Sequence, residues 1–140
     1  MIKLDAELVL ELYVNCKKDL EVGSSYNGLL KVIPIVGGHF NGKLKGRVIS
    51  GGADWNTSKG NGISHAFAKY LIQTDDGEYI AIENEGLIDN KIENSIIRTS
   101  PKFITNKDSR YSWLNYGVYV GSLEPGLEEN QVHIKIYKMM

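Results

Sequence analysis

The sequence predicts an all-β protein: a single closed or nearly closed antiparallel β-barrel of about eight strands, with little helix, spanning residues 1–140. Three observations lead to this fold class. Apolar residues recur at every second position along most of the chain, turn-forming residues separate these stretches at short intervals, and glycines recur within the stretches themselves. The 140 residues are 42% hydrophobic and 24% charged, which suits one domain with its own core.

The first third of the chain predicts two strands and a turn. Leucine or valine occupies every second position of residues 8–14, which predicts a strand with one apolar face. Residues 23–28 are rich in turn formers. Residues 29–36 predict the next strand, in which Pro34 marks a sheet edge or a bulge.

Two glycine-rich segments follow. Residues 39–48 alternate apolar or glycine positions with polar ones, a pattern that predicts a strand bent sharply at a barrel corner. Residues 51–62 contain four glycines together with Asp, Asn, Thr and Ser, and we predict a long loop there.

The middle of the chain predicts a hairpin. Residues 63–74 are compatible with helix or strand, and we favour strand because the Asp-Asp-Gly of residues 75–77 is a hairpin turn signal. Residues 79–84 form the returning strand, with Ile80, Ile82 and Asn84 on one face.

The last third predicts three more strands. Residues 96–104 form a strand around Pro101, and residues 111–123 alternate so that Trp113 and Asn115 share a face. A turn at 124–126 precedes a closing strand over residues 132–137.

Composition excludes several function classes. The formal net charge is -1, so no excess of positive charge is present to neutralise nucleic-acid phosphates. No stretch approaches the roughly 20 apolar residues of a membrane-spanning helix. Residues 1–7 do not read as a signal peptide, and the one cysteine, Cys16, cannot form an intramolecular disulfide; we therefore expect a cytoplasmic protein with no membrane or nucleic-acid partner.

No cofactor or metal is expected. The chain lacks a phosphate-binding loop, a dinucleotide fingerprint and a Gly-x-Ser-x-Gly motif. Its histidines, His39, His65 and His133, are widely separated, so the sequence predicts no metal site. Cys16 lacks an obvious partner base, and a catalytic thiol is not expected.

Asp54 is the first candidate catalytic residue. Its neighbour Trp55 supplies an apolar wall, and a carboxyl group desolvated by an aromatic ring has a raised pKa suited to acid–base catalysis. The structural alternative is that Asp54 accepts backbone N–H groups while Trp55 plugs one end of the barrel. His65, just before an apolar run, is a second acid–base candidate, with a purely structural role as its alternative.

Four residues are candidates for ligand binding: Trp55 as a wall, Arg98 as a clamp for an anionic group, and Trp113 with Asn115 as an indole and an amide that orient a ligand. Each has a structural alternative. Arg98 would pair with Asp54, Glu83 or Asp75, and Trp113 would be core while Asn115 bonds a turn.

Several segments together resemble the domain-of-unknown-function family 3237. The resemblance runs from about Glu7 to Tyr137 and is carried by residues 37–42, 44–48, 51–55 (Gly-Gly-Ala-Asp-Trp), 74–77 (Thr-Asp-Asp-Gly), 98–103 and 111–115. Lys43 departs from the pattern, which has a proline before Leu44. The resemblance implies a small β-barrel similar to those of allene oxide cyclase and dirigent proteins, which hold an apolar small molecule inside the barrel.

From these observations we predict that the barrel binds an unknown small molecule and carries out cofactor-independent isomerase, cyclase or hydratase chemistry in its interior. The alternatives are a binding module without chemistry and a structural or interaction protein, so the sequence leaves open whether the chain is an enzyme. Barrels of this size often form homo-oligomers, and no sequence feature fixes the number of subunits.

Overall fold

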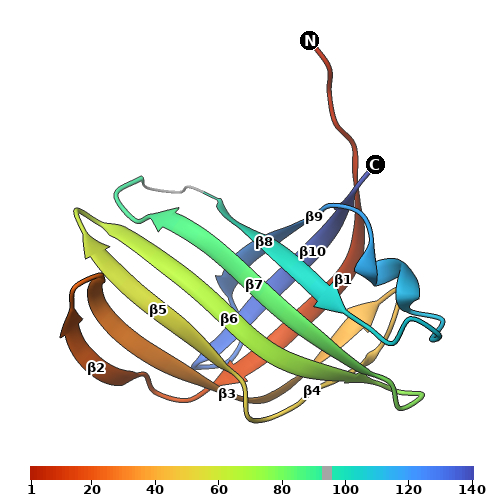
Figure 1. The fold of residues 1–140 in the computed structure, drawn as a ribbon, viewed down its shortest axis with the longest axis horizontal. Coiled ribbons are helices and arrows are strands. Elements are labelled where there is room, and N and C mark those ends of the chain that lie inside the picture. Colours follow the sequence, from red (N-terminus) through yellow and green to blue (C-terminus); the bar gives the residue numbers. More distant parts are fainter. Residues whose placement is uncertain (93–95) are drawn as a thin grey trace.

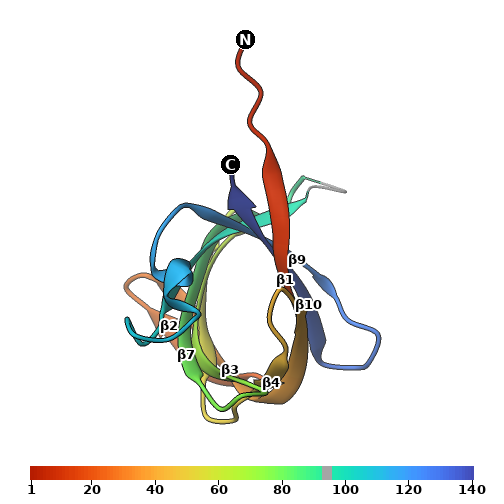
Figure 2. The same cartoon turned by 90° about the vertical axis from the view of Figure 1, so that its right-hand side faces the viewer.

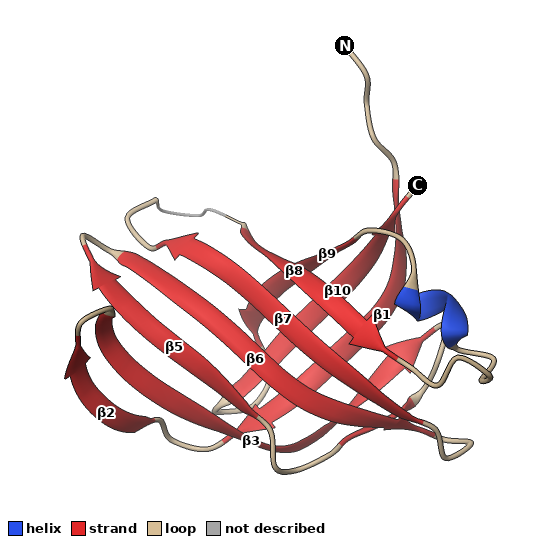
Figure 3. Cartoon of the chain, viewed as in Figure 1, coloured by secondary structure: helices blue, strands red, loops and turns tan. Residues whose placement is uncertain are grey.

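The structure is a computed structural model that describes residues 1–92 and 96–140. Strands dominate the described residues, with one short 3₁₀ helix (Figures 1 and 3). In chain order the elements are β1 (Ala6–Cys16), β2 (Leu20–Ser25), β3 (Gly28–Gly42), β4 (Gly46–Val48), β5 (Ala53–Gly60), β6 (Ile63–Thr74), β7 (Tyr79–Asp89), β8 (Ile97–Ile104), η1 (Ser112–Asn115), β9 (Tyr119–Pro125) and β10 (Gln131–Met139). No helix in this described part is long and apolar enough to cross a membrane.

Eight of the strands close into an antiparallel barrel, which confirms the predicted fold. Strand β1 pairs with β10 on one side and with β3 on the other, and β5 joins β3 to β6. The ring then continues from β6 through β7, β8 and β9 to β10 (Figure 2). The two extra strands are β2, which pairs with β3, and β4, which bridges β3 and β6.

The predicted barrel corner lies in β3, the longest strand. Gly42 has φ +132°, and a Cβ atom built on it would lie 2.5 Å from the carbonyl oxygen of Val9 in β1. A glycine is required because the two backbones approach this closely. Residues 39–48, which were predicted to form one bent strand, do not form a single strand, however. Strand β3 ends at Gly42, and the buried Leu44 lies in the connection to β4.

The prediction of a long loop at residues 51–62 is wrong over most of its length, because Ala53–Gly60 forms β5. This strand pairs along its length with both neighbours, from Pro34↔Ala53 to Leu29↔Ser58 on one side and from Ala53↔Lys69 on the other. Two partner strands satisfy its backbone groups, and that pairing outweighs the polar, glycine-rich composition on which the loop was predicted.

The strand predicted over residues 111–123 is also wrong in its first half. Residues Ser112–Asn115 form η1, and β9 begins only at Tyr119. This segment lies beside the rim at one end of the barrel (Figure 2), where Leu114 is 1% exposed and packs against the core. Burying that leucine favours the helical turn over an extended strand, and Trp113 and Asn115 therefore do not share a strand face.

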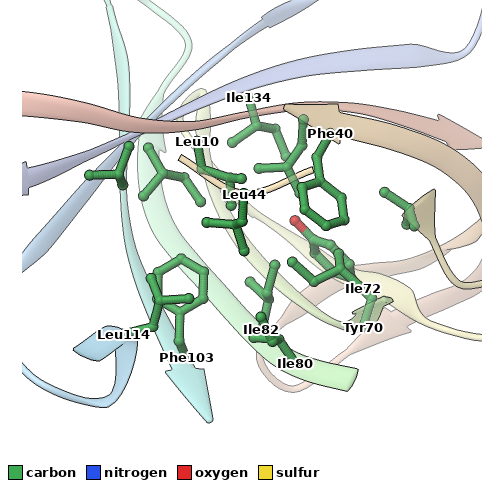
Figure 4. Packing of buried hydrophobic residues seen from close by; sticks show 14 of the residues in the cluster. Leu10, Phe40, Leu44, Tyr70, Ile72, Ile80, Ile82, Phe103, Leu114 and Ile134 are labelled. Atoms are coloured by element: carbon green, nitrogen blue, oxygen red, sulfur yellow. The ribbon is translucent and has the colours of Figure 1, made fainter. Parts of the chain in front are cut away.

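The hydrophobic core fills the half of the barrel next to η1. Large side chains from several strands meet there, including Leu10, Phe40, Ile82, Phe103 and Leu114 (Figure 4). Along β6 the inward positions change from Ile72 and Tyr70 to Ala68 and Ala66 toward the opposite end. The barrel is thus packed at one end and lined by smaller side chains at the other.

Candidate functional site

A cavity of about 120 Å³ lies inside the barrel, beyond the packed half. All eight strands of the closed barrel contribute to its lining. Its wall is mainly apolar, formed by Val14, Ile33, Ile35, Ala66, Ala68, Leu123, Val132 and Ile134, with Cys16 beside them. Four further residues of the lining are polar: Asp54, Tyr70, Asn84 and Thr99. An apolar cavity with a few polar groups on its wall is typical of a small-molecule site.

Three of these polar residues have buried atoms without a hydrogen-bond partner among the described residues. They are the hydroxyl oxygen of Tyr70, Oδ1 of Asn84 and Oγ1 of Thr99. The three residues are 4–5% exposed, and the Tyr70 oxygen is seen among hydrocarbon side chains in Figure 4. A buried polar atom left unpaired costs roughly 1–3 kcal/mol, so three of them around one cavity are unusual for a purely structural interior.

Asp54 lines the same cavity from β5. Its Oδ1 accepts a hydrogen bond of 3.0 Å from the backbone N–H of Phe67. Burial raises the pKa of the Asp54 carboxyl, and this effect exceeds the opposing effects of the Phe67 N–H, the Asn56 side chain and the charge of His65. The two sequence-based interpretations of Asp54 therefore coexist: the carboxylate bonds a backbone amide and also faces the interior.

Strand register explains how Asp54 and Asn84 lie around the same space. Asp54 is opposite Ala68, and Ala68 is opposite Asn84, so the three residues form one row across β5, β6 and β7. Adjacent strands lie about 4.8 Å apart, which places the Cα atoms of Asp54 and Asn84 roughly 10 Å apart in the row. The small side chain of Ala68 leaves the space between them open.

Gly121 brings Thr99 and Asn84 together. Thr99 is opposite Gly121 in the β8–β9 register. A Cβ atom on Gly121 would lie 2.2 Å from Thr99 Oγ1 and 3.6 Å from Asn84 Oδ1. Both unpaired polar atoms therefore lie near the same point beside Gly121, and only glycine leaves room there for the threonine hydroxyl.

Cys16 also borders the cavity. Burial raises the pKa of its thiol, and the nearby Asp54 charge raises it further. The thiol therefore stays protonated near neutral pH and is a poor nucleophile.

His65 lies on the outer face of the barrel. Its Nε2 is 2.7 Å from Oε2 of Glu85, and the two residues come from adjacent strands. Since Ala66 faces the interior, the neighbouring His65 faces outward. Its charge influences Asp54, but its imidazole does not line the cavity.

The structure corrects the expected positions of Trp55 and Arg98, because neither lines the interior cavity. Trp55 is 52% exposed and faces an outer groove with Leu71 and Ala81. Strand alternation is the reason: when Asp54 faces inward, Trp55 must face outward. Arg98 is exposed on the outside of β8, one residue before the inward Thr99. Among the ion pairs of residues 1–92 and 96–140, none joins Arg98 to Asp54, Glu83 or Asp75.

The predicted pair of Trp113 and Asn115 lies at the packed end, away from this cavity. Trp113 packs on the edge of the core, with the Lys138 ammonium 5.9 Å from its ring. Asn115 accepts the N–H of Thr105 at 2.8 Å and donates back to the Thr105 hydroxyl at 2.9 Å. Both residues therefore match their structural alternatives: the Trp113 indole packs against the core, and the Asn115 amide forms hydrogen bonds with a turn.

Sequence reasoning missed Tyr70, Asn84 and Thr99 as site residues. The sequence pattern of β7 did contain a signal for Asn84. Asn84 follows Ile80 and Ile82 at every second position, so a polar side chain lies on the face that the two isoleucines turn toward the core. Tyr70 and Thr99 carry no such signal, since both residue types are common in strands.

In the part of the chain that the structure describes, no group of three His, Cys, Asp or Glu side chains is placed to hold a metal ion. The chemistry that the site residues themselves offer is hydrogen bonding and proton transfer.

Comparison with known proteins shows relatives along the full chain. A UPF0311 protein from Bradyrhizobium diazoefficiens is 28% identical over 98% of this chain and 97% of its own length. The crystal structure of a conserved protein of unknown function from Rhodopseudomonas palustris is similar over 100% of both chains, with 27% identity and a TM-score of 0.88. A crystal structure described as an enzyme from Penicillium herquei covers 99% of this chain and 97% of its own, with 25% identity and a TM-score of 0.77.

The model of one protein family, DUF3237, described as a protein of unknown function, matches residues 4–139. This match confirms the resemblance noted in the sequence. Because it covers nearly the whole chain, the protein belongs to the DUF3237 family.

Proposed function

We propose that this protein binds a small, mainly apolar molecule inside the barrel and carries out cofactor-independent isomerisation, cyclisation or hydration on it, with Asp54 as the acid–base group. One observation carries the proposal: three residues that each have an unpaired buried polar atom, and one residue with a carboxylate, line the same apolar cavity. A ligand whose polar groups pair with Tyr70, Asn84 and Thr99 would remove the cost of leaving those atoms unsatisfied.

The size of the cavity limits the ligand. A dry apolar cavity of about 150 Å³ holds a benzene molecule, and the cavity here is about 120 Å³. The part of the ligand held inside the barrel is therefore no larger than about a six-membered ring.

Asp54 supports the catalytic part of the proposal. Its raised pKa makes the carboxylate a stronger base than an exposed aspartate, and its bond to Phe67 fixes its orientation. A carboxylate offers about four acceptor positions, so the Phe67 N–H leaves others free for a substrate proton. The relative from Penicillium herquei that is described as an enzyme also supports catalysis as a possible use of this fold.

Binding is tested with cyclohexanol as the probe, followed by the backbone amide signals in nuclear magnetic resonance. We expect saturable shifts at strand residues around Asn84, Thr99 and Gly121, with a dissociation constant roughly in the millimolar range for so few atoms. Ala68→Leu, which fills the space between Asp54 and Asn84, should abolish them.

The matched control is Ala81→Leu, the same substitution on the outer face. It should bind cyclohexanol like the unmodified protein. Equal shifts in the unmodified protein and in Ala68→Leu, or no binding by the unmodified protein, would exclude the interior site.

The second candidate is a binding module without chemistry. The same unpaired atoms favour it, because they serve recognition whether or not Asp54 transfers a proton. The two candidates differ in whether Asp54 acts on bound ligand, which the exchange experiment below measures.

A further inference from the structure

We infer that the interior site takes small enolisable carbonyl compounds, with Tyr70 and Thr99 holding the carbonyl oxygen, Asn84 accepting a neighbouring hydroxyl or amine hydrogen, and Asp54 removing a proton from the carbon next to the carbonyl. This assignment rests on the proposed function and adds its substrate class.

The hydrogen-bonding capacity of the unpaired atoms defines the ligand. The hydroxyls of Tyr70 and Thr99 can each donate a hydrogen bond, and neither finds an acceptor among the described residues. Oδ1 of Asn84 can only accept. A complementary ligand therefore carries an acceptor oxygen and, close to it, a donor group, on an otherwise apolar frame that suits the aliphatic wall.

Tyr70 is suited to stabilise negative charge. Burial raises the pKa of its phenol well above the ordinary value, with the nearby Cys16 adding to the effect. The phenol therefore keeps its proton and remains a hydrogen-bond donor throughout the physiological range. A protonated donor fixed in an apolar site is what an enolate oxygen needs, because such hydrogen bonds strengthen as charge develops on the acceptor.

Asp54 is the carboxylate among the lining residues, and it lies across Ala68 from Asn84. A ligand lying over Ala68 would contact the base on one side and the polar atoms of Asn84 and Thr99 on the other. The arrangement separates the proton acceptor from the groups that hold the oxygen, which is the geometry that proton abstraction next to a carbonyl requires.

The reaction step is balanced without a further reactant. The C–H bond next to the carbonyl breaks, an O–H bond forms on Asp54, and the electron pair moves through a new C=C bond onto the carbonyl oxygen. Hydrogen exchange follows when the hydrogen held on the Asp54 carboxyl exchanges with water before a proton returns to the same carbon. Isomerisation follows when the proton returns to another carbon of a conjugated enolate or an enediolate. The protonated thiol of Cys16 argues against a covalent route through that residue.

The test follows deuterium entering cyclohexanone from D₂O by mass spectrometry. The protein should speed the exchange of the hydrogens next to the carbonyl, and Asp54→Asn should lower the protein-dependent rate roughly 100-fold or more, the usual contribution of a general base. Glu83→Gln, which removes an outer-face carboxylate paired with Lys69, is the matched control and should exchange at the unmodified rate.

Two further measurements separate chemistry from folding. With the unmodified protein, the exchange rate should rise with pH through the raised pKa of Asp54 and then level off. Tyr70→Phe and Thr99→Val should each slow exchange, while the binding of methylenecyclohexane, which has the same shape but no oxygen, should be unchanged or stronger.

The outcomes distinguish this inference from the proposed function. If cyclohexanone binds but exchanges equally fast with the unmodified protein and Asp54→Asn, the substrate class is wrong and interior binding stands. If methylenecyclohexane binds as tightly as cyclohexanone, the assigned oxygen contacts are wrong. If neither molecule binds, both proposals fail.

Discussion

At the scale of single residues, the candidate site depends on how successive side chains of β5 alternate between the inner and outer faces of the barrel. Asp54 faces the cavity and Trp55 faces solvent, although the two are adjacent in the chain. The interior neighbours desolvate the carboxyl, and the ionised form of Asp54 is consequently less favourable in the folded protein than in the unfolded chain. A residue whose ionised form opposes folding is consistent with a functional role.

Replacing Asp54 with asparagine should change the pH dependence of stability. Because the folded-state pKa is raised, Asp54 contributes stability that is fully present below its unfolded-state pKa and is lost as the pH rises through its folded-state pKa. We expect Asp54→Asn to have a higher melting temperature than the unmodified protein at pH 7 and to lose that advantage near pH 3. Thermal unfolding monitored by circular dichroism checks this.

Asp108→Asn, an exchange at an exposed position, is the control and should shift the melting temperature by the same small amount at both pH values. A fall in melting temperature for Asp54→Asn that is equal at pH 3 and pH 7 would mean that the bond to Phe67 dominates and that desolvation contributes little.

At the scale of elements, two connections close the packed end. The β6–β7 turn carries Asp76, whose Oδ1 accepts hydrogen bonds from the hydroxyls of Thr74 and Tyr111, while its Oδ2 is 3.2 Å from Nε of Arg110. These contacts fasten the hairpin to the segment that carries η1. The Thr-Asp-Asp-Gly segment of residues 74–77 therefore has a structural role in this protein, since its second aspartate connects two loops.

The Tyr111 hydroxyl should hold the Asp76 carboxyl ionised. The hydrogen bonds from Thr74 and then Tyr111 lower the pKa of Asp76, with the Arg110 charge adding to them. Stability from this connection is therefore present above the unfolded-state pKa of the carboxyl and is lost as the pH falls through its folded-state pKa. In Tyr111→Phe the pKa of Asp76 should rise toward the ordinary aspartate value, as measured by carbon-13 nuclear magnetic resonance of the carboxyl group.

Tyr79→Phe, on an exposed tyrosine at the start of β7, is the matched control and should leave the pKa of Asp76 unchanged. An unchanged pKa of Asp76 in Tyr111→Phe would show that Thr74 and Arg110 suffice to lower it.

The η1 segment is anchored to the core through Leu114, which is almost completely buried. Leu114→Ala should lower the free energy of unfolding by about 2–5 kcal/mol, because it removes buried methyl groups and leaves a void at the end of the core. Denaturant unfolding measures the change. Leu127→Ala, at a leucine that is 93% exposed, should change stability by less than about 0.5 kcal/mol, and an equal loss in both variants would contradict this anchoring role.

At the scale of the whole molecule, one barrel is divided between a packed half and a hollow half. The division follows the size of inward side chains: Ile72 and Phe40 fill one end, whereas Ala66 and Ala68 line the cavity at the other. Barrel closure supplies the stability through continuous strand pairing, which allows part of the interior to remain unfilled.

Filling the hollow half should therefore stabilise the protein while removing its proposed function. Ala68→Leu should raise the free energy of unfolding by roughly 0.5–2 kcal/mol, as cavity-filling substitutions commonly do. Denaturant unfolding checks the gain, and Ala81→Leu on the outer face should give little change. A loss of stability in Ala68→Leu would mean that the interior is too tightly packed to hold a ligand.

Sequence alone determined the fold class, because hydrophobic alternation and turn residues are local properties. The two-residue period identified the strands at 8–14, 63–74, 79–84 and 132–137, and the alternating glycines predicted a close backbone approach such as that of Gly42 in β3 to Val9 in β1. Local chemistry also proposed Asp54, as an acid beside an apolar ring, and Asp54 does line the cavity, but it is the barrel interior and not the outward-facing Trp55 that buries it. The same local reasoning expected Trp55 to be a wall of the interior site. Residues 51–62 were not recognised as a strand, so the sequence could not show which of their side chains face inward.

Tertiary structure decided the rest. Residues 51–62 form a strand only because β3 and β6 lie on either side of them, and residues 112–115 turn into η1 only because the barrel end offers a place to bury Leu114. The site itself combines Asp54, Tyr70, Asn84 and Thr99 from four strands, through register relations between distant parts of the chain. Alternation along one strand gives the face of a residue, but barrel closure decides which residues of different strands share a cavity.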